Sequence, residues 1–79
     1  MISSEQIKGA RALLGWSAAD LAEKSGVGAT TIRRYEMHRG IPKGNVQSLL
    51  TLKTTFESAG IEFTGDPLKN PGVTLNLNK

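Results

Sequence analysis

Cysteine is absent from this sequence of 79 residues, histidine occurs once, and aromatic residues make up 5%. The absence of cysteine excludes disulfides, thiolate zinc sites and thiol catalysis, and one histidine leaves few ligands for any other metal site. The longest purely apolar run is residues 12–14, and the first residues lack the basic and hydrophobic segments of a secretory signal. We therefore expect a cytoplasmic protein that crosses no membrane and holds no metal or cofactor.

Length and composition fit one small globular domain. The chain is 38% hydrophobic and 22% charged, outside the ranges typical of disordered, collagen-like or coiled-coil chains. A core of this size buries only about 60% of the surface that the unfolded chain exposes. We therefore expect no large multi-site enzyme, and no set of nucleophile, base and acid is apparent from which to predict catalytic residues.

The positive charge is concentrated in one stretch of the chain. Residues 24–43 contain five basic side chains and one acidic side chain, a net charge of +4, whereas the whole chain carries +3. A field this localised favours a polyanion such as nucleic acid, because each neutralised phosphate releases counterions. The alternative is a solvated basic face that has no partner.

Capping residues and apolar spacing predict four helices followed by two strands. The helices are expected from Ser3 to Gly15, from Ser17 to Gly26, over residues 29–37, and over about fourteen residues between Asn45 and Gly60. The apolar period then changes from about 3.6 to 2, which predicts strands at residues 61–64 and 73–77. The predicted class is mainly α: a four-helix domain over residues 1–60 and a strand pair over residues 61–79.

The predicted third helix presents basic residues on its outer face. Placing Ile32 at the core divides its other residues into two faces at 100° per residue. The inner half holds Ala29, Tyr35 and Glu36, and the outer face holds Thr30, Arg34 and Met37, with Arg33 on its flank.

The second and third predicted helices, with the glycine between them, have the residue spacing of a helix-turn-helix. The matching positions are Leu21, Ala22, Gly26, Val27, Ile32 and Tyr35. Ala22 must be small where the third helix crosses, and Gly26 permits the turn. Residues 14–17, 21–27 and 32–36 resemble the phage-repressor-like (Cro/Xre-type) helix-turn-helix family of bacterial and phage transcriptional regulators. The resemblance covers roughly residues 4–60 and implies the four-helix repressor-like fold.

This resemblance implies that the third helix lies in the major groove of DNA and that the second crosses the backbone. By position, Ala29, Thr30 and Arg34 would face bases: an arginine can donate two parallel bonds to guanine, and alanine or threonine can contact a thymine methyl. The positions implied for phosphate contacts are Ser17, Arg33, Arg39 and Lys43. His38 has no second ligand at metal spacing, and we assign it to a phosphate or to the carboxyl end of the third helix.

In this family an arginine on the first helix commonly pairs with a glutamate near the end of the recognition helix. Arg11 and Glu36 occupy those positions. The pair either sets the tilt of the recognition helix or is an ordinary structural ion pair. The sequence departs from the family at Ala18, where a glutamine often reaches a phosphate, and at Gly28, where a hydroxyl side chain usually caps the third helix.

The C-terminal strands differ from the fifth helix through which many relatives dimerise. The last strand can fold back on residues 61–64 or pair with a partner subunit. We expect a twofold homodimer whose candidate contact surface consists of Leu52, Phe56, Val73, Leu75 and Leu77. The alternative is that these residues close the core of a monomer.

The leading hypothesis is a sequence-specific regulator, a repressor, that binds double-stranded DNA at an inverted repeat and is associated with the nucleoid. The alternative is a helix-turn-helix module that binds another protein, as an antitoxin or anti-activator does. Met37 beside the arginines motivates this alternative.

Overall fold

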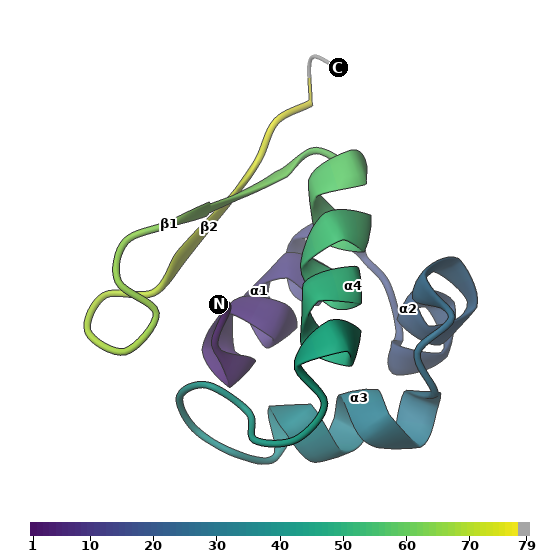
Figure 1. Cartoon of the computed structure of the whole chain (residues 1–79). Coiled ribbons are helices and arrows are strands. Elements are labelled where there is room, and N and C mark those ends of the chain that lie inside the picture. Colours follow the sequence, from purple (N-terminus) through teal and green to yellow (C-terminus); the bar gives the residue numbers. More distant parts are fainter. Residues whose placement is uncertain (78–79) are drawn as a thin grey trace.

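The computed structural model describes residues 1–77, so residues 78 and 79 of the predicted C-terminal segment lie outside the described range. In that range the helices are α1 (Ser4–Leu14), α2 (Ala18–Ser25), α3 (Ala29–Glu36) and α4 (Val46–Ser58), followed by the strands β1 (Ile61–Thr64) and β2 (Gly72–Leu75). The predicted mainly α class is confirmed. The helix α3 lies across the start of α4, and the hairpin lies on the other side of α4 from α2 (Figure 1).

Side-chain caps begin the helices where the sequence predicts them. The Ser3 hydroxyl accepts a bond of 3.2 Å from the Gln6 amide N–H, and the Ser3 amide N–H donates to Gln6 Oε1 at 2.9 Å. Ser17 and Asp20 form the same reciprocal pair at α2, with bonds of 3.0 and 2.9 Å. Asn45 Oδ1 accepts from the amide of the second residue of α4 at 2.9 Å. Each cap satisfies amide N–H groups that have no partner within the helix.

The turn between α2 and α3 depends on glycine. Gly26 has a φ of +78°, in the left-handed region that disfavours any residue with a Cβ. Its amide N–H closes the helix on the Ala22 carbonyl at 2.9 Å. The chain therefore reverses at this point and brings α3 back across α2.

One apolar core joins the helices to the hairpin. Its fully enclosed members include Ile7, Leu21, Ile32, Leu52 and Phe56. The Trp16 ring stacks on Phe56, and the Phe63 ring of β1 meets Phe56 edge-on, with both pairs of ring centroids 6.0 Å apart. Ile61 of β1 is 4% exposed and belongs to the same core. Residues 1–60 and 61–77 therefore share one core.

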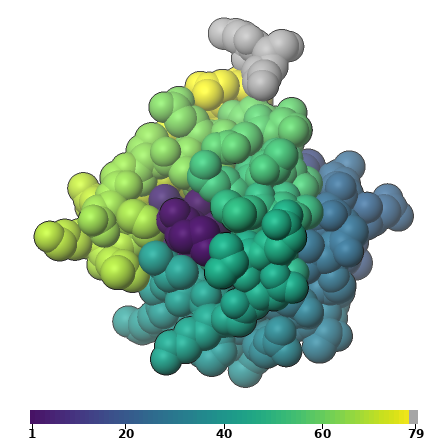
Figure 2. Space-filling view, viewed as in Figure 1, coloured from purple at the N-terminus to yellow at the C-terminus, as the bar shows by residue number. Residues whose placement is uncertain are grey.

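The strands pair with each other within the chain. They are antiparallel, with Ile61 opposite Leu75 and Thr64 opposite Gly72. The hairpin rests on α1, where Gln6 Nε2 donates to the carbonyls of Thr64 and Gly72 at 3.3 and 3.1 Å. The N-terminal residues lie between the hairpin, the loop after α3 and α4 (Figure 2). Of the two predicted arrangements for the last strand, the described chain adopts the intramolecular hairpin.

The second strand ends before the predicted position. Leu77 lies beyond β2 and is 84% exposed. In the observed register Leu77 would stand opposite residue 59, which is the C-cap of α4 and cannot pair as a strand. The Asn76 amide N–H instead donates to the Gly60 carbonyl at 2.8 Å, and the pairing stops there.

Two residues predicted at a dimer surface lie inside the chain's own core. Leu52 and Phe56 are both 0% exposed, so no second copy can touch them in this fold, and that part of the prediction is wrong. The apolar side chains along α4 are divided between the core and the solvent. Leu49, Leu52 and Phe56 face the core, whereas Val46 and Leu50 are 56% and 43% exposed. Val73 and Leu75 are half-buried against the core.

Candidate nucleic-acid interface

The inner face of α3 fixes how this helix sits on the rest of the domain. Ile32 is completely buried and Tyr35 nearly so, and Val27 fills the corner after Gly26. The Tyr35 hydroxyl donates to the Asn45 carbonyl at 3.3 Å, which links α3 to the start of α4. Of the four residues predicted to face inward, Ile32 and Tyr35 are buried, and Ala29 and Glu36 are half-buried.

The outer face of α3 is polar, basic and open to solvent. Thr30, Arg33, Arg34 and Met37 are exposed, as the helical spacing predicts, and Ala29 is half-buried at the first turn. Within residues 1–77 neither Arg33 nor Arg34 has a carboxylate within ion-pair distance. The Arg34 guanidinium lies 6.0 Å from the ring centroid of Tyr35, a contact that orients it without satisfying its N–H groups.

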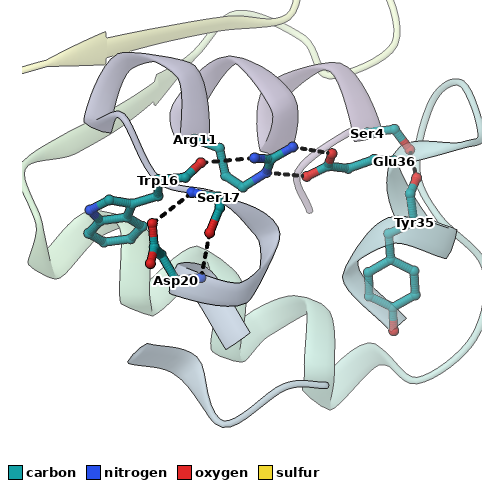
Figure 3. A network of polar contacts seen from close by, with 7 residues as sticks. All are labelled: Ser4, Arg11, Trp16, Ser17, Asp20, Tyr35 and Glu36. Carbon is teal, nitrogen blue, oxygen red and sulfur yellow. Dashed lines mark hydrogen bonds and ion pairs between the residues drawn. The ribbon is translucent and has the colours of Figure 1, made fainter. Parts of the chain in front are cut away.

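Arg11 connects three parts of the domain. Its Nε and Nη2 donate to the two carboxylate oxygens of Glu36, both at 2.7 Å, and its Nη1 donates to the Trp16 carbonyl at 2.8 Å (Figure 3). The hydrogen bond to Glu36 raises the pKa of Arg11 above its ordinary value. The predicted ion pair is confirmed. It joins α1 to the end of α3 and to the segment that leads into α2.

The start of α1 holds the carboxyl end of α3 through further polar contacts. The Ser4 hydroxyl donates to the Tyr35 carbonyl at 2.6 Å (Figure 3), and the Ser4 amide N–H donates to the Gly40 carbonyl at 2.7 Å. Glu5 Oε1 accepts from the Gly40 amide N–H at 3.2 Å, and backbone hydrogen bonds lower the pKa of Glu5. The sequence analysis did not predict these contacts. The only sign of these contacts in the sequence is the run of polar residues 3–6. Their partners lie far away along the chain, so the run alone does not identify them.

The residues predicted to touch phosphates fall into separate places. Arg39 and Lys43 lie in the loop after α3, where they line one small pocket, and Arg33 lies on α3. Ser17 lies apart from them at the start of α2, with Asp20 beside it. Hydrogen bonds from the Ser17 backbone and side chain lower the pKa of Asp20, so a carboxylate accompanies this serine. Of the four residues predicted to contact phosphates, Ser17 alone carries no positive charge, and it has an acidic neighbour.

A separate groove lies away from these residues. It has a volume of about 640 Å³ and runs between α2 and α4, lined by Trp16, Lys24 and residues of α4. Lys24 Nζ lies 5.1 Å from the Trp16 ring centroid and is the one charged group among the residues that line it. A lone lysine over an indole is a packing contact and supplies no acid–base pair.

No helix in residues 1–77 is both long and apolar enough to cross a membrane. No group of three or more histidine or acidic side chains in the same range is placed to hold a metal ion.

Comparison with known proteins identifies the same segment as the geometry does. A helix-turn-helix family model matches residues 7–49, more than half of the chain, from α1 through α2 and α3 into the start of α4. No curated protein matches the chain. The matched segment contains the glycine turn, the buried face of α3 and its exposed basic face. The chain belongs to the Cro/Xre-type helix-turn-helix family of DNA-binding regulators.

Proposed function

We propose that the chain is a sequence-specific repressor of bacterial or phage genes. It binds an inverted-repeat operator as a homodimer in the cytoplasm, with α3 in the major groove of nucleoid DNA. One observation carries this proposal: α3 is fixed along its inner face and at its carboxyl end, while Thr30, Arg33 and Arg34 stand free on its outer face. Fixed geometry with unpaired donors favours binding to a ligand that has its own fixed acceptors.

The base contacts are proposed for Ala29 and Thr30 on the first turn of α3 and for Arg34 on its last turn. Arg34 donates two parallel bonds to guanine O6 and N7, and the Thr30 methyl and Ala29 pack on a thymine methyl. Arg33, Arg39 and Lys43 contact phosphates on either side of the groove, and the Ser17 hydroxyl contacts the backbone near the start of α2. Within residues 1–77, Arg33 and Arg34 have no ion pair to break before they bind DNA.

The size of the domain supports a dimer on adjacent turns of DNA. Its longest dimensions are 33 and 30 Å. Half-sites one helical turn apart are separated by about 34 Å, so two copies on the same side of the duplex would meet. The exposed Leu77, with the half-buried Val73 and Leu75, stays the proposed contact surface.

Selection of bound duplexes from a random-sequence pool tests the proposal first. The expected product is an inverted repeat with half-sites about 10 base pairs apart, centre to centre. A pool with no enriched sequence would refute sequence-specific binding.

Variants then test the residue assignments on the selected duplex. Arg34→Ala should relax the preference at one base pair per half-site, a loss of about 1–3 kcal/mol at that position. Lys43→Ala should weaken binding to every sequence alike and reduce the salt slope by about 0.9 per protomer. Lys53→Ala is the matched control, because Lys53 lies on α4 in an ion pair of 3.1 Å with Glu57 and should leave binding unchanged. Equal effects of Arg34→Ala on all operator variants would contradict base contact by Arg34.

A protein-binding role is the second candidate, because Met37 is 82% exposed at the end of α3. Methionine is flexible and polarizable and is common at protein surfaces that bind partners. If the chain fails to bind any duplex at low salt while Met37→Lys abolishes capture of one specific protein, this function replaces the first.

A further inference from the structure

A cluster of polar side chains is buried at the start of α1. Ser3 and Ser4 are both 0% exposed, and Gln6 is 3% exposed. Burial of a hydroxyl or an amide costs free energy unless the group is hydrogen-bonded. Within residues 1–77 every buried side-chain nitrogen and oxygen has a hydrogen-bond partner. The partners of these residues therefore indicate what each of them holds in place.

The two adjacent serines hold different parts of the fold. The Ser3 hydroxyl bonds to the Gln6 amide N–H at 3.2 Å and to Gln6 Oε1 at 3.4 Å, so both of its contacts stay at the start of α1. The Ser4 hydroxyl instead donates to the Tyr35 carbonyl, 31 positions away, at 2.6 Å (Figure 3). Ser3 therefore stabilises its own helix, whereas Ser4 joins α1 to α3.

The bond from Ser4 satisfies a carbonyl at the end of α3. Tyr35 is the next-to-last residue of this helix, and the last carbonyls of a helix have no partner within it. The Ser4 hydroxyl supplies that partner. The Tyr35 hydroxyl donates to the Asn45 carbonyl at 3.3 Å. Tyr35 is thus hydrogen-bonded both at its backbone and at the tip of its side chain.

Polar side chains hold α3 at its carboxyl end. Within residues 1–77 no side chain caps the first turn, where Gly28 is the N-cap residue. At the other end Glu36 accepts from Arg11, and Tyr35 accepts from Ser4. These two bonds act on different atoms of one turn, a side chain and a backbone carbonyl, so together they restrict rotation of the helix more than either does alone. Arg34 directly precedes this doubly held pair of residues.

We propose that Ser4 is a positioning residue for sequence recognition: its hydroxyl fixes the turn of α3 from which Arg34 reaches a base. This role rests on the proposed function and deepens it. Two parallel bonds to a guanine need donor atoms held to within about 0.5 Å, whereas attraction to phosphates acts over about 10 Å and tolerates small shifts. Loss of the Ser4 hydroxyl should therefore weaken binding to the operator more than binding to unrelated DNA.

Ser4→Ala and Ser3→Ala form a matched pair of variants. Each removes one hydroxyl from a fully enclosed residue, and each keeps the backbone bond from the Ser4 amide N–H to the Gly40 carbonyl. Both should lower the midpoint of urea denaturation, because each breaks a buried hydrogen bond. A difference between them in DNA recognition is then not explained by lost stability.

Fluorescence anisotropy measures the affinity of each variant for the selected operator and for a scrambled duplex of the same length and composition. Ser4→Ala should lower the operator affinity about fivefold per half-site, the low end of the range for loss of a bidentate base contact. Its affinity for the scrambled duplex should change by less than about twofold, since phosphate contacts remain. Ser3→Ala should keep the natural ratio of the two affinities.

The double variant Ser4→Ala/Arg34→Ala tests whether Ser4 acts through Arg34. Changes that remove the same contact are not additive. At the base pair whose preference Arg34→Ala relaxes, the added Ser4→Ala should cause no further loss. Additive losses there, or a Ser4→Ala protein that loses affinity equally for both duplexes, would overturn the inference while leaving DNA binding intact. A natural chain that prefers no sequence would instead refute the proposed function.

A spectroscopic measurement and a second variant cover the case in which Ser4→Ala fails to fold. The ¹³C resonance of the Tyr35 carbonyl reports its hydrogen bond, and it should shift in a Ser4 variant and stay in place in Ser3→Ala. Ser4→Cys keeps a side chain of similar size with a weaker donor, so it should lower the ratio of operator to scrambled affinity by less than fivefold per half-site. A shifted carbonyl resonance with an unchanged ratio of affinities would overturn the inference.

Discussion

Removal of the Arg11 guanidinium should destabilise the fold and loosen α3 together. An exposed ion pair contributes about 0–1 kcal/mol, and breaking a fully buried one costs about 3–5 kcal/mol. The side chains of Arg11 and Glu36 are 24% and 11% exposed, between these limits. Arg11 also donates to the Trp16 carbonyl, a bond worth about 1 kcal/mol. We therefore expect Arg11→Met to lower the free energy of unfolding by about 2–3 kcal/mol.

Urea denaturation measures this loss, with Trp16 as the one tryptophan of the chain and therefore the reporter of tertiary structure. The partner variant Glu36→Gln and the double variant complete a cycle. The double variant should lose less than the sum of the single variants, with a coupling of about 1–2 kcal/mol, because Arg11→Met alone leaves a carboxylate desolvated. The free energy of unfolding of Arg11→Lys should lie between those of the natural chain and Arg11→Met. Lysine keeps the positive charge but cannot donate two parallel hydrogen bonds to the carboxylate. Additive losses, or a cost of Arg11→Met below about 0.5 kcal/mol, would refute this role of the pair.

Three other predictions concern the turn, the acidic limit of stability and the hairpin. Gly26→Ala should cost about 1–2 kcal/mol in urea denaturation, because the φ of +78° is strained for alanine; an unchanged midpoint would contradict it. The pKa values of Asp20 and Glu5 are lowered below 3.8 and 4.5, so their contribution to stability is present above those values and is lost as the pH falls through the lowered pKa. The melting temperature of Asp20→Asn should accordingly fall less steeply as the pH is lowered than that of the natural chain. The same dependence of melting temperature on pH in both proteins would argue against the capping role. Gln6→Ala removes the two bonds from α1 to the hairpin carbonyls and should speed amide exchange in β1 and β2 more than in α4; equal acceleration in both would contradict a local effect.

Local signals predicted most of the helical architecture. Caps at Ser3, Ser17 and Asn45 act within three residues of the chain, and a glycine such as Gly26 fixes a turn by its own φ preference. Such features depend only on residues that are neighbours in the sequence. The residue spacing of α3 likewise separates Ile32 from Arg34 without any knowledge of the remaining fold.

Contacts between distant segments were not predictable in the same way. The Ser4 hydroxyl meets the Tyr35 carbonyl across 31 positions of the chain, and Gln6 reaches the hairpin across 58 and 66. No spacing rule connects such residues. The error at Leu52 and Phe56 has a similar cause: apolar periodicity marks a face of α4 but does not distinguish the chain's own core from a partner's surface.

The sequence predicted the exposed face of α3 but not the shape of the loop that follows it. The outward positions of Thr30 and Arg34 followed from helical geometry. The pocket that joins His38, Arg39 and Lys43 did not, because the loop after α3 has no periodicity and takes its shape from Ser4, Glu5 and the hairpin.

The central claim is that the outer face of α3 reads bases in the major groove through Arg34. The most direct test compares the natural chain and Arg34→Ala on the selected operator with each guanine in turn replaced by 7-deazaguanine, which lacks the N7 acceptor. At one guanine per half-site the natural chain should lose about 1 kcal/mol or more, and Arg34→Ala should lose nothing further there. Equal losses for both proteins, or no loss at any guanine, would contradict the claim.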